Sequence, residues 1–470
     1  MKRTVALACS TALLAGGLIA PAAATAAPPS VIVVAPGGND HAAGTVAAPL
    51  RTVNVAIGRL SRGGTVELRS GRYHQRVLLD GAHNITVQPY RREHAVLDGA
   101  GLTPPTDLTA LVTIVNSSAI TVEGLEITGY RSSTLGAVPA GIYVHGGDHG
   151  ITIDGNHVHD LGNHNRTLGS FDINAHGIAV YGDDPQHPVT GLRIRGNTVD
   201  HLTLGASETV VVNGNVDGWA ITGNDIHDNN NIGIDAIGYE ETLPAKFRYT
   251  QLNRARNGVI SGNHVARIRS QGNPAYYEDG GYCNCADGIY VDGGTRIVVG
   301  NNTVTDNDIG VEVAAENARG SADHVLVAGN HITGSLYVGI ATGGYCDGGD
   351  ECGGDPTGAS FDNAFVGNTL CGNNRLDDGS PELLVQYYAH DNLFAGNSIT
   401  ATNTGHVVYG TVPNSDSDGR SSGNVSDANT FRAEPGSAAL AEFGWHGKTY
   451  TGFASYRQHT GQDRHSTFRG

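Results

Sequence analysis

The 470-residue sequence is poor in methionine, in basic residues and in long hydrophobic runs. One Met beside 67 Gly argues against a helical protein, because abundant Gly suits short strands joined by tight turns. Lys and Arg number only 29 against 46 Asp and Glu, which gives a formal net charge of −17. This charge makes nucleic acids and anionic membranes poor partners.

Only the N-terminal segment is strongly hydrophobic. Residues 1–26 hold a basic start, an apolar run and an Ala-Thr-Ala site, the pattern of a secretory signal peptide cut after Ala26. No later apolar run is long enough to span a bilayer. The sequence therefore predicts a secreted, extracellular protein without a membrane partner.

A short unit repeats through most of the chain. Gly-Asn or Asn-Asn, a small apolar strand, a turn and then Gly-Ile or Gly-Val recur at spacings typical of a solenoid. Alternation in pairs such as Ile289 and Val291 places every second side chain inside. We predict an all-β fold, a right-handed parallel β-helix of about ten coils.

The two ends of the predicted solenoid need caps that cover its apolar interior. We expect residues 27–424 to form the β-helix with an N-terminal helical cap, and residues 425–470 to form a short C-terminal capping segment. Apolar residues at helical spacing mark the N-terminal cap: Val53, Ala56, Ile57 and Leu60. Three aromatic residues of the tail are interpreted as cap core: Trp445, Tyr450 and Tyr456.

The repeated Asn is interpreted as structural. A side-chain amide stacked coil upon coil bonds its neighbours and the backbone at a buried bend. The Asn residues concerned are Asn156, Asn197, Asn224, Asn263, Asn302, Asn330, Asn368, Asn397 and Asn424, and Leu125 holds the equivalent place earlier in the chain.

Acidic residues gather in three consecutive coils: Asp235, Asp287, Asp292, Asp308, Glu312 and Glu316. Aligned on Gly-Ile, the strands form one outward column of Tyr143, Ala179, Asp235, Tyr290, Glu312 and Ala341. A second column two residues along contains His145, Tyr181, Ile237, Asp292 and Ala314. Solvated surface is the alternative interpretation for any single acid, and the concentration of acids favours a site.

The spacing of the acids suits glycoside hydrolysis. Neighbouring coils stack about 4.8 Å apart, so the carboxylates of Asp235 and Glu312, two coils apart, are expected roughly 9–10 Å apart. That separation leaves room for a water, as in inverting glycosidases, while Asp292 and Glu312 lie closer, as in retaining ones. These three acids are the candidate catalytic carboxylates. Close like charges raise one pKa and create a proton donor.

Three insertions interrupt the repeat: Tyr239–Asn257, Arg269–Ala286 and Tyr345–Asp362. They leave the edge of the acidic strands and are expected to wall a cleft. The first carries Lys246, Arg248, Arg254 and Arg256, of which Lys246 and Arg248 are candidate bases for a lyase. The predicted substrate-binding residues are Tyr143, His145, Tyr239, Glu240, Tyr290 and Glu316.

The cysteines after the signal are Cys283, Cys285, Cys346, Cys352 and Cys371. Outside the cell such residues favour disulfides over metal sites. Cys346 and Cys352 flank a Gly/Asp loop that a disulfide would close. The connectivity is left open, and with five thiols at least one lacks an intrachain partner.

These features resemble a known group. The opening segment and the TGQDRHS ending are similar to those of bacterial right-handed parallel β-helix proteins of the pectate-lyase-like superfamily, which have the pectin lyase fold. The resemblance covers nearly the whole mature chain. It implies an extracellular β-helix, and many members cut polysaccharides by β-elimination or hydrolysis.

A finer similarity is to calcium-dependent pectate lyases, which carry A-D-G-F on one coil and D-D-G-x-D on the next. CADGIY places Asp287, and NDIGVE places Asp308 and Glu312, in the corresponding positions, with Ile309 replacing one Asp. The resemblance implies a Ca²⁺ site of these three acids. The catalytic Lys of those enzymes has no counterpart, because residues 335–368 contain no Lys.

Three functions remain open on this reading of the sequence. The first is a Ca²⁺-assisted lyase acting on a polyuronate, the second a glycoside hydrolase with paired carboxylates, and the third a non-catalytic glycan-binding solenoid. All three predict a monomeric protein whose partner is a polysaccharide.

Overall fold

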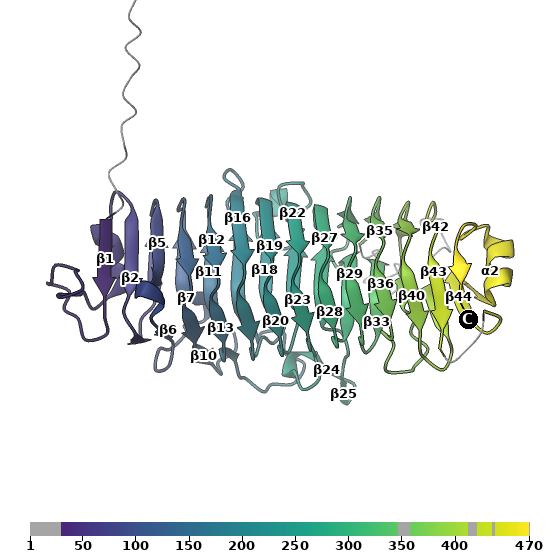
Figure 1. The fold of residues 1–470 in the computed structure, drawn as a ribbon, viewed down its shortest axis with the longest axis horizontal. Helices are drawn as coiled ribbons and strands as arrows, with labels where there is room; N and C mark the ends of the chain where they lie inside the picture. The colour runs from purple at the N-terminus through teal and green to yellow at the C-terminus, as the bar shows by residue number, and fades with distance from the viewer. Residues whose placement is uncertain (1–29, 346–357, 412–420, 435–437, 470) are drawn as a thin grey trace, which may run out of the picture.

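The protein is an elongated solenoid of stacked parallel strands, as a computed structural model describes for residues 30–345, 358–411, 421–434 and 438–469 (Figure 1). Each turn of the chain adds one strand to each of three long sheets. The predicted all-β fold, a right-handed parallel β-helix, is confirmed. The sheets run to at least thirteen strands each, more than the about ten coils expected.

The first sheet carries the acidic residues and is called the site sheet. Its thirteen strands are parallel except for the last pair. In spatial order they are β4 (Val77–Asp80), β7 (Asp107–Val115), β11 (Ala137–His145), β15 (His176–Gly182), β18 (Val210–Gly214), β21 (Ile234–Ile237), β26 (Asp287–Asp292), β29 (Ile309–Ala315), β33 (Val338–Gly344), β37 (Leu383–Val385), β41 (Val407–Thr411), β44 (Glu442–Trp445) and β45 (Lys448–Thr451).

The second sheet follows the site sheet in each turn of the chain. Its main path is β1 (Ser30–Val34), β2 (Gly64–Leu68), β5 (Ile85–Pro89), β8 (Thr121–Glu123), β12 (Thr152–Asp154), β16 (Val189–Arg195), β19 (Val216–Thr222), β22 (Arg256–Ser261), β27 (Thr295–Gly300), β31 (Leu326–Ala328), β35 (Ala364–Val366), β39 (Leu393–Ala395) and β42 (Val425–Asp427). Three short strands branch from it: β30 (Ala322–Asp323), β34 (Ser360–Phe361) and β38 (Ala389–His390).

The third sheet completes each coil. It contains β3 (Gly71–Tyr73), β6 (Ala95–Asp98), β9 (Glu126–Thr128), β13 (His157–His159), β17 (Thr198–Asp200), β20 (Asp225–His227), β23 (His264–Ala266), β28 (Thr303–Thr305), β32 (His331–Thr333), β36 (Thr369–Cys371), β40 (Ser398–Ala401), β43 (Thr430–Ala433) and β46 (Thr467–Phe468). Two small pairs lie outside the three sheets: β10 (Arg131–Ser132) with β14 (Gly162–Asn163), and β24 (Tyr277–Glu278) with β25 (Gly281–Tyr282).

Helical segments are short and lie at the ends or in the insertions. The α-helices are α1 (Val53–Arg59) and α2 (Phe453–Thr460), at opposite ends of the solenoid (Figure 1). The 3-10 turns are η1 (Tyr90–Arg92), η2 (Ala245–Phe247) and η3 (Pro274–Tyr276). Within the residues described, no helix is long and apolar enough to cross a membrane.

One continuous apolar core runs through the inside of the coils. It joins α1, through Val53 and Ala56, to α2, through Phe453 and Tyr456. Trp445 and Tyr456 are buried and Tyr450 packs against the core, as expected of core residues. Beyond Asn424, β42 and β43 still pair with β39 and β40, so the sheets continue into the C-terminal segment.

The repeated Asn residues form a buried ladder along one bend, as predicted. Asn263, for example, donates from Nδ2 to Asn302 Oδ1 at 3.0 Å and accepts from the backbone N–H of Asn224. Leu125 donates its N–H to Asn156, which confirms its equivalent place. The ladder ends at Asn429; the placement of Asn424 in it was wrong. Asn424 belongs to a second ladder, which also contains Asn363 and Asn392.

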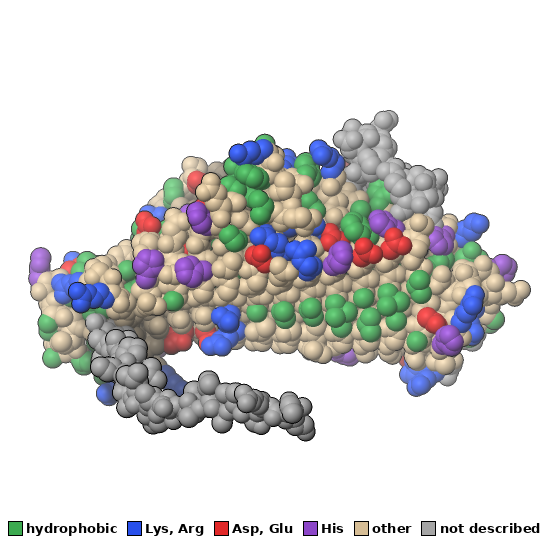
Figure 2. Space-filling model, turned by 90° about the horizontal axis from the view of Figure 1, so that it is seen from above, with side chains coloured by type: hydrophobic (Ala, Val, Ile, Leu, Met, Phe, Trp, Pro, Cys, Tyr) green, Lys and Arg blue, Asp and Glu red, His purple; other side chains and the backbone are tan. Residues whose placement is uncertain are grey.

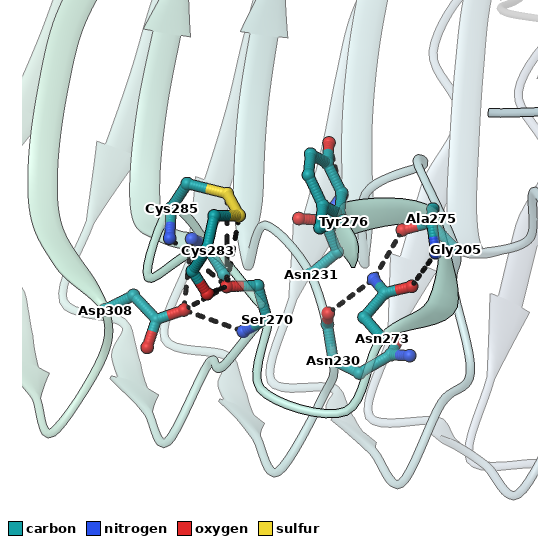
Figure 3. Close-up of a disulfide and its surroundings, with 11 residues drawn as sticks. Gly205, Asn230, Asn231, Ser270, Asn273, Ala275, Tyr276, Cys283, Cys285 and Asp308 are labelled. Atoms are coloured by element: carbon teal, nitrogen blue, oxygen red, sulfur yellow. Dashed lines mark hydrogen bonds between the residues drawn. A yellow bond between two sulfur atoms is a disulfide. The ribbon is translucent and has the colours of Figure 1, made fainter. Parts of the chain in front are cut away.

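Two of the five cysteines that follow the predicted signal peptide are bonded to each other in the described part of the chain. Cys283 and Cys285 form a disulfide within the second insertion (Figure 3). Cys371 is a free thiol. Cys346 and Cys352 lie outside the described residues.

Candidate functional site

The predicted outward column exists. Asp235 on β21 pairs with Tyr290 on β26, and Tyr290 pairs with Glu312 on β29. Asp235 and Glu312 are therefore two strand spacings apart, as the sequence predicted. One strand was missed: β18 enters between β15 and β21, and its Val211 pairs with both Ala179 and Asp235.

Carboxylates line one cavity of about 280 Å³ over the middle of the site sheet. This acidic cavity is lined by five acids: Glu208, Asp235, Glu240, Asp292 and Glu316. The other lining residues are Asn174, Tyr181, Ala206, Ser207, Asn213, Ile232, Ile237, Tyr276 and Tyr290. Glu240 comes from the first insertion and Tyr276 from the second, so these two insertions wall the cavity as predicted. Figure 2 shows charged side chains along the middle of one face of the molecule.

The acids on the site sheet are buried without full hydrogen bonding. Asp235 is 2% exposed and Asp292 is 4% exposed. Asp292 Oδ1 accepts the backbone N–H of Glu316 at 2.9 Å, whereas Asp235 Oδ1 has no hydrogen-bond partner. A buried acceptor without a partner costs stability, so a ligand that donates to Asp235 would recover that cost.

Burial shifts the ionisation of these acids. It raises the pKa of Glu208 to about 8, with the charges of Glu316 and Glu240 adding to the effect. Burial and the neighbouring charge of Glu208 hold the pKa of Asp235 well above its usual range. The pKa of Asp292 is raised by burial and by Glu316. Because adjacent carboxylates cannot all ionise in a low dielectric, the cavity keeps protons at neutral pH.

Glu208 was missed in the sequence. It reaches the cavity from the turn before β18, and His176 Nδ1 lies 3.1 Å from its carbonyl oxygen and 3.5 Å from its Oε2. Burial lowers the pKa of His176 to about 4, so this imidazole is neutral at pH 7. The only signal was an acid before a Val run, in SETVVVNG, because this strand lacks the Gly-Ile pair that aligned the others.

Of the three acids of the calcium similarity, Asp308 bonds other protein groups, whereas Asp287 and Glu312 lie beside each other. Asp308 turns toward the second insertion, where its Oδ2 accepts from the N–H of Ser270 at 2.7 Å and from the Ser270 hydroxyl at 2.6 Å (Figure 3). Asp287 and Glu312 lie side by side, and burial with the Glu312 charge raises the pKa of Asp287. Among the described residues, no group of three or more His, Cys, Asp and Glu is arranged to hold a metal ion.

Glu312 is buried next to the cavity and is not part of its wall. Burial raises the pKa of Glu312 to about 7. Its Oε1 has no hydrogen-bond partner, as is also true of Oδ1 of Asp287. These two acids form a second carboxyl pair beside the acidic cavity.

The basic residues of the first insertion hold structure together instead of lining the cavity. Arg254 is fully buried and donates to the carbonyls of Gly293 and Gly294 and to Asp323. Arg248 donates to the Tyr239 carbonyl and to Asn317. Arg256 bonds Asp217 and Asn215 in the same way, whereas Lys246 is exposed beside the ring of Phe247.

Three predicted binding residues lie outside the acidic cavity. Tyr239 is buried, with the guanidinium of Arg254 5.0 Å from its ring centroid, and is part of the insertion's own packing. Tyr143 and His145 line a separate hollow of about 540 Å³ toward the N-terminus of the site sheet. This N-terminal hollow is also lined by Asn54, Arg76, Val77, Leu78, Leu108, Thr109, Ala110 and Thr113.

A related sequence covers almost the whole chain. The uncharacterized protein YwoF of Bacillus subtilis is 34% identical over 439 residues, which span 92% of this chain and 86% of that protein. Pectate lyase PEL9 of Emericella nidulans is 28% identical over 115 residues, 23% of this chain and 28% of that enzyme. No family model matches the sequence.

Solved structures share the fold at low identity. A GH136 lacto-N-biosidase from Eubacterium ramulus superposes with a TM-score of 0.51 and 13% identity, over 93% of this chain and 67% of that chain. A tailspike protein of E. coli bacteriophage HK620, in complex with a hexasaccharide, also has a TM-score of 0.51 and 13% identity, over 83% of this chain and 64% of that chain. These likenesses show the parallel β-helix.

Proposed function

The chain belongs to the family of the uncharacterized protein YwoF and to the pectate-lyase-like superfamily of parallel β-helix proteins, and we propose that it is a glycoside hydrolase acting on polysaccharides. One observation carries this proposal. Five carboxylates line the acidic cavity, and no Lys or Arg is among the described residues of its wall. Hydrolysis of a glycosidic bond needs two carboxyl groups of different protonation state and no basic side chain.

The raised pKa values suggest how the roles divide. Glu208, with its pKa raised to about 8, keeps its proton at neutral pH and is the proposed general acid that protonates the leaving oxygen. Asp292, whose pKa is also raised by burial and by Glu316, accepts the Glu316 N–H through Oδ1, and on the strength of that hydrogen bond it is the proposed base or nucleophile. Asp235 lies on the floor with a free oxygen for a sugar hydroxyl.

The rest of the wall suits a sugar ring. Tyr181, Tyr276 and Tyr290 line the cavity and offer apolar faces with hydroxyl groups at their edges. Neutral His176 holds the Glu208 backbone and acts as a positioning residue. The lacto-N-biosidase named above is a saccharide-cleaving enzyme with this fold, in keeping with the proposal.

A lyase is the second candidate, favoured by the local similarity to pectate lyase PEL9. β-Elimination needs a strong base beside a uronate. Arg254 is committed to buried carbonyls and Asp323, and Lys246 is not in the cavity wall. The Ca²⁺ that the similarity implies finds no three-residue ligand set in the described chain, so no step is assigned to it.

The test is a digestion panel of neutral glycans and polyuronates. A hydrolase releases new reducing ends without products that absorb in the ultraviolet as unsaturated uronates do. Glu208→Gln and Asp292→Asn are each expected to lower the rate of that release by about 10²–10⁴-fold. Unsaturated products would support the lyase instead, and retention of glycans without cleavage would support a binding protein.

A further inference from the structure

We propose that the N-terminal hollow is a second glycan-binding site, in which the guanidinium of Arg76 pairs with an acidic group of the polymer several sugar units away from the cleavage point. This inference rests on the proposed hydrolase. It adds a residue that selects an anionic glycan, carrying carboxylate or sulfate groups.

The hollow and the acidic cavity lie on the same outward face of the site sheet. Tyr143 pairs in register with Ala179, Ala179 with Val211, and Val211 with Asp235. Three strand spacings of about 4.8 Å put Tyr143 roughly 14 Å from Asp235 along the solenoid. A polymer laid along the coils would reach both.

The two hollows share an aromatic wall. Tyr143 lines the N-terminal hollow and Tyr181 lines the acidic cavity, and their rings meet edge to face with centroids 6.0 Å apart. Both rings pack against Ala179 and Val211, which form a small apolar floor between the hollows. Ala179 and Val211 are fully buried, so a chain of sugars would pass over the rings of Tyr143 and Tyr181 along the outward face from Arg76 to Asp235, which is called the trough.

Arg76 is the cation of this trough. Arg76 lines the hollow, and within the described part of the chain no acidic side chain forms an ion pair with its guanidinium. Its backbone carbonyl is held by Asn54 of α1, at 3.0 Å, which fixes the start of β4. A guanidinium with free donors binds carboxylate or sulfate oxygens through two parallel hydrogen bonds.

Two acidic groups act on Tyr143 at the edge of the hollow, and each accepts a hydrogen bond from the backbone. Asp183 lies 3.2 Å from His145 Nδ1 and accepts the Gly146 N–H, so His145 and the backbone already engage it. Asp107 is exposed at the start of β7 and accepts from the Leu108 N–H. In a chain of formal net charge −17, one unpaired Arg in the trough is the local attraction that an anionic glycan needs.

The experiment compares Arg76→Ala with Arg193→Ala, which removes an exposed Arg from β16 on the second sheet, outside the trough. The substrate is the best one from a panel of acidic glycans and their neutral counterparts, such as polygalacturonate and its methyl ester. Arg76→Ala should lower kcat/KM about tenfold or more, mainly through KM, and only on acidic polymers. Arg76→Lys should keep part of the activity and Arg193→Ala all of it.

A neutral best substrate, or an Arg76→Ala enzyme as active as Arg193→Ala, would overturn the proposal. If the protein cleaves no glycan, the hydrolase fails, and gel retardation by polygalacturonate, alginate and dextran sulfate tests the hollow alone. Retardation that Arg76→Ala removes and Arg193→Ala keeps would support the site. Absence of retardation of the wild-type protein by every acidic polymer would reject it.

Discussion

The Asn ladder and the acidic cavity are both buried and polar, yet they differ in how their polar atoms are satisfied. Asn197 and Asn263 donate and accept hydrogen bonds along the ladder from one coil to the next. Asp235 and Glu312 each keep one carboxylate oxygen without any partner. Buried polar groups therefore have complete hydrogen bonding in the ladder and incomplete hydrogen bonding among the acids.

The difference separates structure from chemistry. A satisfied buried polar group stabilises the fold and specifies its register, whereas an unsatisfied one costs free energy and persists where a ligand uses it. The ladder identifies what holds the coils together. Among the described residues, buried carboxylate oxygens without a partner occur at Asp235 in the acidic cavity and at Asp287 and Glu312 beside it, and also at Asp148 and Asp308 outside it.

The largest expected effect is a loss of activity when the acids of the cavity are replaced, which substitutions in the Asn ladder should not cause. Glu208→Gln, Asp235→Asn and Asp292→Asn should each lower kcat on the best glycan by about 10²–10⁴-fold, since each removes a proton donor, a ligand or an anion of the cavity. The melting temperature should not fall, because each substitution removes a buried acid that repels the neighbouring carboxylates. The control is Asp225→Asn on β20 of the third sheet, which should stay active. Full activity in all three cavity variants would place the site elsewhere.

The next effect concerns Arg254, a buried charge whose hydrogen bonds are all made within the protein. Arg254→Ala should destabilise the fold by about 3–5 kcal/mol, because it leaves Asp323 buried without its cation. Lys246→Ala, in the same insertion, is expected to change neither stability nor activity because Lys246 is exposed. Denaturant titration of both variants checks this. An Arg254→Ala protein that is stable but inactive would revive the lyase with Arg254 as its base.

A smaller loss is expected in the ladder itself. Asn302→Ala should lower the free energy of unfolding by about 1–3 kcal/mol for each buried hydrogen-bonding group that it leaves unpaired. It should not affect kcat. The matched control is Asn301→Gly, an exposed neighbour whose φ of 55° glycine accepts without strain. Thermal melts give the comparison. Equal stability of the two variants would contradict the structural role of the ladder.

The pH dependence of stability sharpens the contrast further. The pKa of Glu208 is raised in the folded state to about 8 from 4.5, so the folded protein holds this proton more tightly than the unfolded chain does. Its stabilising effect is complete below the unfolded pKa and is lost as pH rises through about 8. We expect the melting temperature to fall between about pH 5 and pH 8, and to fall less in Glu208→Gln. Identical pH profiles would show that Glu208 is not shifted.

The smallest expected effect is that of calcium. Binding to the folded state alone would raise the melting temperature with Ca²⁺ concentration. Because Asp308 Oδ2 already accepts two hydrogen bonds from Ser270, we expect the melt to be the same in Ca²⁺ and in EDTA. A clear rise with Ca²⁺ would restore the three acids as a metal site and strengthen the lyase.

Much of the fold could be predicted because the repeat is local. Gly-Asn dipeptides and alternating apolar residues are visible in any single coil, and the register of Tyr143, Asp235 and Glu312 follows from aligning them. The coil of β18 could not be found in this way, since VVVNG lacks the Gly-Ile pair. Asn424 was placed in the wrong ladder because two parallel ladders share the same local pattern.

The candidate site could be predicted only in part, because its wall comes from segments far apart in the sequence. Asp235 and Asp292 were found from their column, and Glu240 from its insertion. Glu208 was not, because its place depends on how the turn before β18 packs. The roles of Arg254 and Arg248 were missed for the same reason: their partners lie up to 69 residues away.

The most direct test of the account is digestion of the best glycan substrate in water enriched in heavy oxygen, followed by mass spectrometry of the products. Hydrolysis in the acidic cavity predicts one heavy oxygen at each new reducing end, and about 10²–10⁴-fold less product from Glu208→Gln in the same time. Products without heavy oxygen that carry an unsaturated end would contradict the account, as would labelled products formed equally well by the Glu208→Gln protein.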